Sequence, residues 1–311
     1  MTETDKKILE MRNRGMSLRQ IATALFRSPT KESTVRYRLS KMDKPTTSAR
    51  VLVLDIETAP CKSFHWRRWK ENISQNQAIS ESYVLTWAAK WLGEDIIMSD
   101  SIRLYEEYNL DPEDDSKVVG SLVELLKQAD YVVAHNGVRF DIPVIRTRMA
   151  YHGFNPLLPF TDIDTLLIAK REFKFPSNSL DAIAQYLGIG SKDKHSKFPG
   201  FSLWRGVMED NLEAWEEMLT YNEADVLLLE EVYLAIRQWD RKHPNLALRG
   251  DMSEERCPVC GSEDLHETGK HDVTNLSKFP VLRCGNCGKV SSRRQTVLDK
   301  EQRALQLRNT K

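Results

Sequence analysis

Two carboxylates in the stretch Val51–Thr58 have a spacing that suits metal chemistry. The apolar run Val51-Leu-Val-Leu54 leads directly into Asp55 and Glu57. A run of this length with β-branched members predicts a buried strand, on which residues two apart point to the same side. Two adjacent acids at the end of a buried strand favour a divalent cation between them. The alternative is an ordinary strand end with two solvated acids.

Two later segments carry further acids. Asp141 follows the predicted buried strand 131–134 and the polar turn His135-Asn-Gly137, and it begins the next predicted helix. Ligands bind at such strand ends, although a helix dipole alone also favours an acid there. Tyr221 and Asp225 open a predicted long helix and, four residues apart, share one face.

Together these residues resemble the motif set of the DEDD superfamily of 3′–5′ exonucleases, which have a ribonuclease H-like fold. The resemblance rests on Asp55-x-Glu57, Asn136-x-x-x-Phe-Asp141 and Tyr221-x-x-x-Asp225, with Tyr in place of His as in the tyrosine subclass. It covers roughly residues 51–240. It is strongest to phage and prophage ribonuclease H-like proteins with an N-terminal helix-turn-helix and a C-terminal zinc ribbon, including their Phe201-Ser-Leu-Trp204 stretch.

The resemblance implies two-metal hydrolysis of phosphodiester bonds. In that scheme Asp55, Glu57, Asp141 and Asp225 hold two Mg²⁺ or Mn²⁺ ions, and Tyr221 orients the attacking water. Thr58 and Asn136 would lie against the nucleic acid. The expected activity is a 3′–5′ exonuclease acting on DNA. A structure-selective endonuclease or an RNA exonuclease would use the same four acids, and a non-enzymatic DNA-binding regulator is the third alternative.

The pattern of apolar residues predicts an α/β domain with a mixed sheet flanked by helices. Residues 83–91 and 96–104 are predicted to continue the first strand as an antiparallel meander. The other predicted strands are 131–134 and 159–163, and the predicted helices are 118–128, 140–151, 165–171, 180–187, 212–219 and 222–239. Trp66, Trp69, Trp87 and Trp91 are candidates for stacking on bases, with core packing favoured for Trp87 and Trp91.

The first 44 residues predict three short helices that resemble a helix-turn-helix of the resolvase or sigma-factor type. Ser17 is the expected N-cap of the second helix, and residues 35–41 form the third, which would enter the major groove. The residues expected to face DNA are Thr34, Arg36, Tyr37, Arg38 and Lys41. A protein-interaction module with a solvated basic face is the alternative.

Four of the five cysteines form two close pairs, Cys257-Pro-Val-Cys260 and Cys284-Gly-Asn-Cys287. Four thiolates at C-x₂-C-x₂₃-C-x₂-C spacing predict one structural Zn²⁺ in a small zinc ribbon. The alternatives are an iron–sulfur cluster and a redox thiol pair. Such a module could grip DNA or dock a replication or repair protein, and the sequence favours neither role.

Charge is divided unevenly along the 311 residues. Residues 1–50 have net charge +7 and residues 256–311 have +5, whereas residues 51–255 have −12. Basic ends suit a polyanionic partner. The absence of an apolar run of about 20 residues and of a signal peptide predicts a cytoplasmic protein without membrane contact (host cytoplasm if phage-encoded).

The predicted segments follow from these patterns. They are a helix-turn-helix domain (1–44), a linker (45–50), a ribonuclease H-like exonuclease domain (51–242), a linker (243–255), a zinc ribbon (256–296) and a charged tail (297–311).

Overall fold

The computed structural model of the chain describes residues 3–13, 16–28, 31, 34–35, 38, 49–67, 69, 72–190, 197–250 and 252–307. These residues divide into two compact units, Arg50–Tyr233 and the combination of Met1–Ala49 with Leu234–Lys311. Among the described residues, none of the helices has the length and apolar character needed to cross a bilayer.

A five-stranded mixed sheet forms the centre of the Arg50–Tyr233 unit. Its strand order is β5-β4-β1-β6-β7. The pairs β1–β4 and β4–β5 are antiparallel, whereas β1–β6 and β6–β7 are parallel. The strands are β1 (Val51–Thr58), β4 (Val84–Trp91), β5 (Ile97–Ser101), β6 (Tyr131–Ala134) and β7 (Thr161–Asp164). The predicted mixed sheet and its antiparallel start are confirmed.

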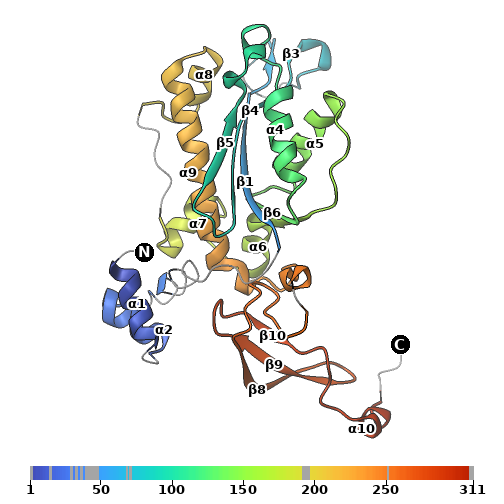
Figure 1. The fold of residues 1–311 in the computed structure, drawn as a ribbon. Coiled ribbons are helices and arrows are strands. Elements are labelled where there is room, and N and C mark those ends of the chain that lie inside the picture. The colour runs from blue at the N-terminus through green and yellow to red at the C-terminus, as the bar shows by residue number, and fades with distance from the viewer. Residues whose placement is uncertain are drawn as a thin grey trace. The chain divides into compact units, whose positions relative to one another are not determined.

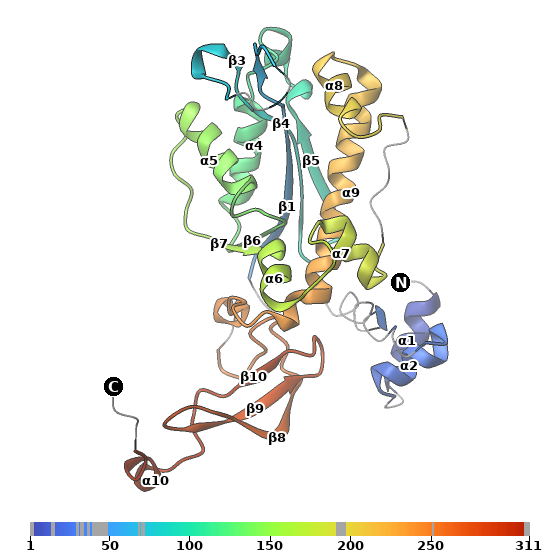
Figure 2. The ribbon, with the colours of Figure 1, turned by 180° about the vertical axis from the view of Figure 1, so that it is seen from behind.

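Helices cover both faces of this sheet. Figure 1 shows α4 (Ser116–Leu126) and α5 (Asp141–Tyr151) on one face and α9 (Leu212–Ile236) along the other. The view from behind in Figure 2 gives the same layers. The shorter helices of this unit are α6 (Thr165–Glu172), α7 (Leu180–Leu187) and α8 (Ser202–Met208), with 3₁₀ turns at Gln75–Gln77, Ile102–Leu104 and Glu106–Asn109.

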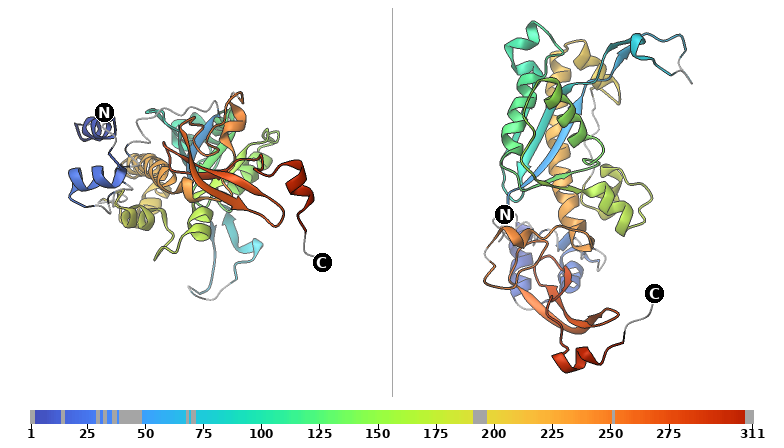
Figure 3. Two further views of the ribbon diagram at one scale, coloured as in Figure 1. Left: turned by 90° about the horizontal axis from the view of Figure 1, so that it is seen from below. Right: turned by 90° about the vertical axis from the view of Figure 1, so that its right-hand side faces the viewer.

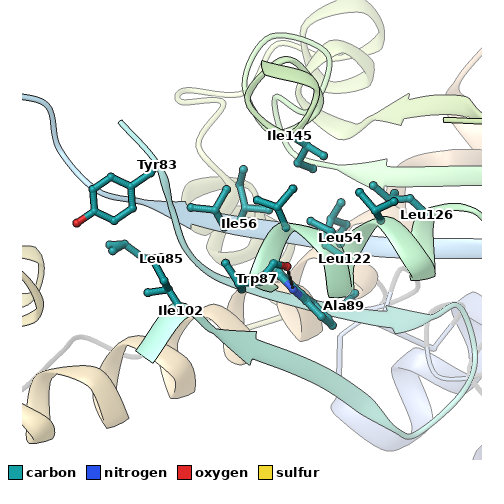
Figure 4. Packing of buried hydrophobic residues seen from close by; sticks show 14 of the residues in the cluster. Leu54, Ile56, Tyr83, Leu85, Trp87, Ala89, Ile102, Leu122, Leu126 and Ile145 are labelled. Atoms are coloured by element: carbon teal, nitrogen blue, oxygen red, sulfur yellow. Dashed lines mark hydrogen bonds between the residues drawn. The ribbon is translucent and has the colours of Figure 1, made fainter. Parts of the chain in front are cut away.

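Strand alternation decides which side chains reach which layer. Leu54 and Ile56 of β1 and Trp87 of β4 join the buried core under α4 and α5, as Figure 4 shows. Trp87 also donates from Nε1 to the carbonyl of Val118 at 3.0 Å. Trp87 and Trp91 are 4% and 8% exposed, so the predicted core role is confirmed for both. The alternate residues of β1 and β4, Asp55 and Glu57 among them, therefore face α9.

Helix α9 differs from the prediction. The sequence predicted two helices, 212–219 and 222–239, with Tyr221 at the start of the second. The structure has one continuous helix, Leu212–Ile236, followed by a 3₁₀ turn at Arg237–Trp239. No glycine or proline interrupts residues 219–222, so nothing local ends the helix there. Tyr221 and Asp225 consequently lie in the middle of a rigid element.

A small hairpin was not predicted. Strands β2 (Lys62–Ser63) and β3 (Ala78–Ser80) pair antiparallel between β1 and β4. The segment 62–80 is called the aromatic hairpin below, because Phe64, Trp66 and Trp69 lie in it.

The second unit contains two small modules. Helices α1 (Glu3–Asn13) and α2 (Leu18–Phe26) share a cluster of buried residues, Ile8, Ile21, Ala22 and Val35. The predicted N-cap is confirmed, because Ser17 Oγ accepts from the Gln20 backbone N–H at 3.3 Å. The other module is a three-stranded sheet of β8 (Leu265–Val273), β9 (Lys278–Cys284) and β10 (Val290–Ser292), with a 3₁₀ turn at Leu246–Arg249 before it and α10 (Lys300–Ala304) after it.

Candidate active site

Three of the four predicted acidic ligands meet between β1 and α9. Each of Asp55, Glu57 and Asp225 offers a carboxylate oxygen, and these oxygens all lie within 4.8 Å of one another. Asp225 is buried at 4% exposure, and Asp55 and Glu57 are half-buried. Strand alternation brings the first two together, and the helix packed on that face supplies the third.

Asn222 holds Asp55 in place. Its Nδ2 donates to Asp55 Oδ2 at 2.7 Å, and its Oδ1 accepts from Thr86 Oγ1 at 3.1 Å. Both Asn222 and Thr86 are fully buried. The amide therefore links α9 to two strands and fixes the orientation of one carboxylate. No role was predicted for Asn222, since an asparagine three residues before an aspartate does not by itself indicate a contact with a distant strand.

Asp141 lies beside this group but is not one of its three members. Its Oδ1 accepts from the backbone N–H of Ile56 at 3.3 Å, between the two acids of β1. Burial, reinforced by the charge of Asp164, raises the pKa of Asp141 to about 7. A buried carboxyl of this kind becomes stable as an anion when a cation is near it.

Asp164 shapes the turn that leads to Asp141. Its Oδ1 accepts from the backbone N–H groups of Leu166 and Leu167 and caps α6. The same carboxylate accepts from the N–H of Asn136 at 3.0 Å and of Val138 at 3.2 Å. Asp164 therefore caps α6 and holds the turn before Asp141.

Asn136 has a left-handed backbone with φ 71°, a conformation that asparagine tolerates better than most residues. A side chain at Gly137 would bring its Cβ to 2.5 Å from that of Ala134. The turn is thus specified by an asparagine, a glycine and the carboxylate of Asp164. This turn places Asp141 at the start of α5.

Tyr221 lies one helical turn before Asp225 on α9. Its ring packs edge-on against Trp204 of α8, with ring centroids 6.2 Å apart. Thr58, the last residue of β1, is half-buried and pairs with Val84 of β4 across a register shift.

The predicted DNA-facing residues of the N-terminal module are described only in part. Thr34 and Arg38 are half-buried. Arg36, Tyr37 and Lys41 lie outside the described residues.

The four cysteines form a second candidate metal centre. Their sulfur atoms all lie within 4.8 Å of one another, and the residues are buried. Cys257 Sγ lies 3.5 Å from Cys287 Sγ, and Cys260 Sγ lies 3.7 Å from Cys284 Sγ. Tetrahedral Zn–S bonds of about 2.3 Å place ligand sulfurs roughly 3.8 Å apart, and a disulfide would bring them to about 2 Å. The site therefore fits a zinc ion.

Three glycines lie in the turns around the sulfur atoms, two because of their backbone angle and one because of close packing. Gly261 and Gly288 have φ 72° and 81°, as expected for glycines in such turns. Gly285 does not have a positive φ. A side chain there would place its Cβ 1.9 Å from Asp264 Oδ2, so close packing, and not the backbone angle, requires this glycine.

The acidic centre fits hard divalent cations. Carboxylate oxygens are the ligands that Mg²⁺ and Mn²⁺ prefer. Three of them lie within 4.8 Å of one another, with the buried carboxyl of Asp141 adjacent, and this all-oxygen donor set suits such ions.

A comparison with protein-family models agrees with this architecture. A family model described as the RNase_H superfamily matches residues 92–237. A search of curated proteins finds no match. The family B DNA polymerase from the hyperthermophilic archaeon Pyrobaculum calidifontis is a similar solved structure, at 16% identity and a TM-score of 0.42. That match covers 61% of this chain and 26% of the polymerase, so the chain spans about a quarter of it. With its mixed sheet between layers of helices, the Arg50–Tyr233 unit has an RNase H-like fold.

Proposed function

We propose that the chain is a metal-dependent 3′–5′ exonuclease of the DEDD type, tyrosine subclass, acting on DNA. The observation that carries the proposal is the group of three carboxylate oxygens from β1 and α9 within 4.8 Å of one another. The RNase H-like fold supports a nuclease, although fold alone does not assign a reaction. The DNA specificity rests on the basic N-terminal segment.

Asp55, Glu57 and Asp225 would hold the ions, with Asp141 as the fourth ligand. Two bound Mg²⁺ or Mn²⁺ ions supply Lewis acidity, lower the pKa of water and neutralise charge on the phosphate. The chain's own part is to place oxygen ligands rigidly. Asn222 achieves this for Asp55 through its 2.7 Å hydrogen bond.

Tyr221 would orient the attacking water. It shares a helix face with Asp225, and the ring of Trp204 supports it from α8. A hydroxyl held beside the carboxylates can accept or donate one hydrogen bond to a water molecule, which fixes the direction of attack.

Hydrolysis of labelled oligonucleotides tests the proposal. A 5′-labelled DNA strand with Mg²⁺ or Mn²⁺ should give a ladder that shortens from the 3′ end, and a covalently closed circle should stay intact. RNA and duplex DNA are assayed in the same way as further substrates. Asp225→Asn should abolish the ladder, whereas Glu216→Gln, an exposed acid on the same helix, should not.

Four outcomes would overturn the proposal or redirect it. If no substrate gives a metal-dependent product, the chain is not a nuclease. If Asp225→Asn and the unchanged protein hydrolyse DNA at equal rates, the carboxylate group is not the active site. Cleavage of the closed circle assigns an endonuclease. Faster hydrolysis of RNA than of DNA would assign the same reaction to an RNA substrate.

A further inference from the structure

The aromatic hairpin, residues 62–80, exposes large apolar side chains. Trp66 and Trp69 are 94% and 83% exposed, and Phe64 is 75% exposed. Tryptophan has a large apolar surface whose hydration is unfavourable. Single exposed apolar residues are ordinary, but three aromatic ones within six positions mark an interaction surface.

The base of the hairpin is held firmly. The Phe64 N–H donates to the Gln77 carbonyl at 2.9 Å, and Gln77 Nε2 donates back to the Phe64 carbonyl at 3.1 Å. Lys62 pairs with Glu113 at 2.9 Å. Figure 3 (right) shows this segment, in blue, extending beyond the helices that flank the sheet. The exposed aromatic residues therefore lie on a loop with a defined base.

The hairpin begins beside the candidate active site. Strand β1 carries Asp55 and Glu57 and ends at Thr58, only four residues before Lys62. The chain returns into β4, and the Ala59 N–H donates to the Tyr83 carbonyl at 2.9 Å where the two strands separate. A polymer that reaches the carboxylates at this end of β1 has the hairpin next to its path.

The charge of the segment is complementary to a polyanion. The sequence Trp66-Arg-Arg-Trp-Lys70 alternates aromatic and basic residues within a central region of net charge −12. Aromatic faces stack on unpaired bases of any sequence, and neighbouring cations attract the phosphates. A membrane or a protein partner would be attracted by the apolar surface too, but neither would need this placement next to a carboxylate site.

We infer that the aromatic hairpin binds the unpaired bases of single-stranded nucleic acid by stacking on Trp66 and Trp69, beside the carboxylate site. This inference adds a substrate-binding element to the proposed function, and it rests on that function in taking nucleic acid as the bound polymer. Stacking on these two rings positions the strand whose end reaches Asp55 and Glu57.

Binding in buffer free of Mg²⁺ and Mn²⁺, and without chelator, separates this inference from hydrolysis. A 5′-fluorescein-labelled single strand is titrated with the full chain, and anisotropy gives the dissociation constant. The double variant Trp66→Ala/Trp69→Ala should bind roughly 10- to 100-fold more weakly. Trp66→Phe/Trp69→Phe should recover most of the affinity. Trp239→Ala, which removes a tryptophan 60% exposed outside the hairpin, should bind as the unchanged protein does.

A strand of the same length built with abasic sites is the matched ligand. It keeps the phosphates but offers no base to stack on, so the alanine and unchanged proteins should bind it equally. The unfolding midpoints should also agree, because both side chains are exposed.

The inference is overturned if the double alanine variant keeps full affinity, if its loss is equal on the abasic strand, or if the unchanged protein binds no strand. A normal hydrolytic ladder with unchanged affinity in the alanine variant refutes the hairpin role and leaves the exonuclease intact. Base-dependent binding without any hydrolytic ladder supports the hairpin role and refutes the exonuclease.

Discussion

At the scale of single residues, the candidate site depends on groups that do not themselves bind metal. Asn222 is fully buried and bonds to Asp55 and Thr86. Outer groups of this kind tune metal affinity by fixing the ligand's orientation. The position of Asp55 is therefore set by α9 as much as by its own strand.

Replacing Asn222 tests this role. Asn222→Ala should weaken Mn²⁺ binding about 10- to 100-fold and should reduce stability, because Thr86 loses a buried partner. Glu216→Gln is the control, since Glu216 is an exposed acid on the same helix. Calorimetric titration with Mn²⁺ and thermal unfolding measure the two effects. Equal Mn²⁺ affinity in Asn222→Ala and Glu216→Gln would contradict the role.

Asp141 predicts a pH dependence for the metal-free protein. Burial raises its pKa from 3.8 to about 7, so between these values the folded state binds more protons than the unfolded state. The free energy of unfolding from this group therefore falls as pH rises through the window, and it is lowest above pH 7. Asp141→Asn keeps an acceptor for the Ile56 N–H and removes the titration.

Thermal unfolding in EDTA measures this effect. The stability of Asp141→Asn relative to the unchanged protein should be clearly greater at pH 8.5 than at pH 5.5. Glu216→Gln should leave the difference between the two pH values unchanged. A constant offset for Asp141→Asn at both values would argue that Asp141 is ionised throughout.

At the scale of elements, the turn between β6 and α5 joins two parts of the site. Asp164 accepts from four backbone N–H groups, two in the turn and two in α6. One carboxylate therefore ends β7, starts α6 and holds the turn that precedes Asp141.

Asp164→Ala should lower the free energy of unfolding by about 2–4 kcal/mol, because several buried donors lose their acceptor. Hydrogen exchange should accelerate at Asn136, Val138, Leu166 and Leu167. Asp162→Ala is the matched control, because Asp162 lies on the same strand and its Oδ1 has no hydrogen-bond partner. If both variants exchange alike, the turn does not depend on Asp164.

Elements with strong local patterns were predictable from the sequence, and elements defined by distant contacts were not. β1, β4 and β6 are apolar runs, and their strands were predicted within a few residues. The strands of the aromatic hairpin are only two and three residues long, too short for a period of apolar residues to mark them. The continuity of α9 agrees with the absence of glycine and proline from residues 219–222, whereas the packing of its face on the sheet, where Asn222 contacts a residue 167 positions earlier, has no local sign.

The same distinction applies to the site. Asp55 and Glu57 are close because strand geometry makes them so, and this was predictable. Asp225 joins them through tertiary packing, and the sequence placed it there only by the resemblance. Asn222 acts through contacts across the fold, as does Asp164 in its bonds to Asn136 and Val138. Spacing along the chain carries no sign of such contacts.

At the scale of the whole molecule, the chain combines two compact units whose stability has different sources. The Arg50–Tyr233 unit has an extended apolar core around its sheet. In the four-cysteine module, by contrast, the buried cluster consists of the four cysteines and Val259, with Leu265 packed against it. A module with so little apolar core would depend on a zinc ion bound by these cysteines for its folding.

Removal of zinc should therefore unfold one part of the chain and spare the other. With a strong zinc chelator, hydrogen exchange should rise across β8, β9 and β10 and stay unchanged across β1, β4 and β6. Cys260→Ser should have the same effect without chelator, whereas Cys61→Ser, at an exposed cysteine outside the group, should have none. Because the acidic ligands lie in the Arg50–Tyr233 unit, Mn²⁺ affinity should persist after zinc removal. Loss of protection in β1 or β6, or loss of Mn²⁺ binding, would mean that the zinc site stabilises the sheet as well, and that the two units fold as one.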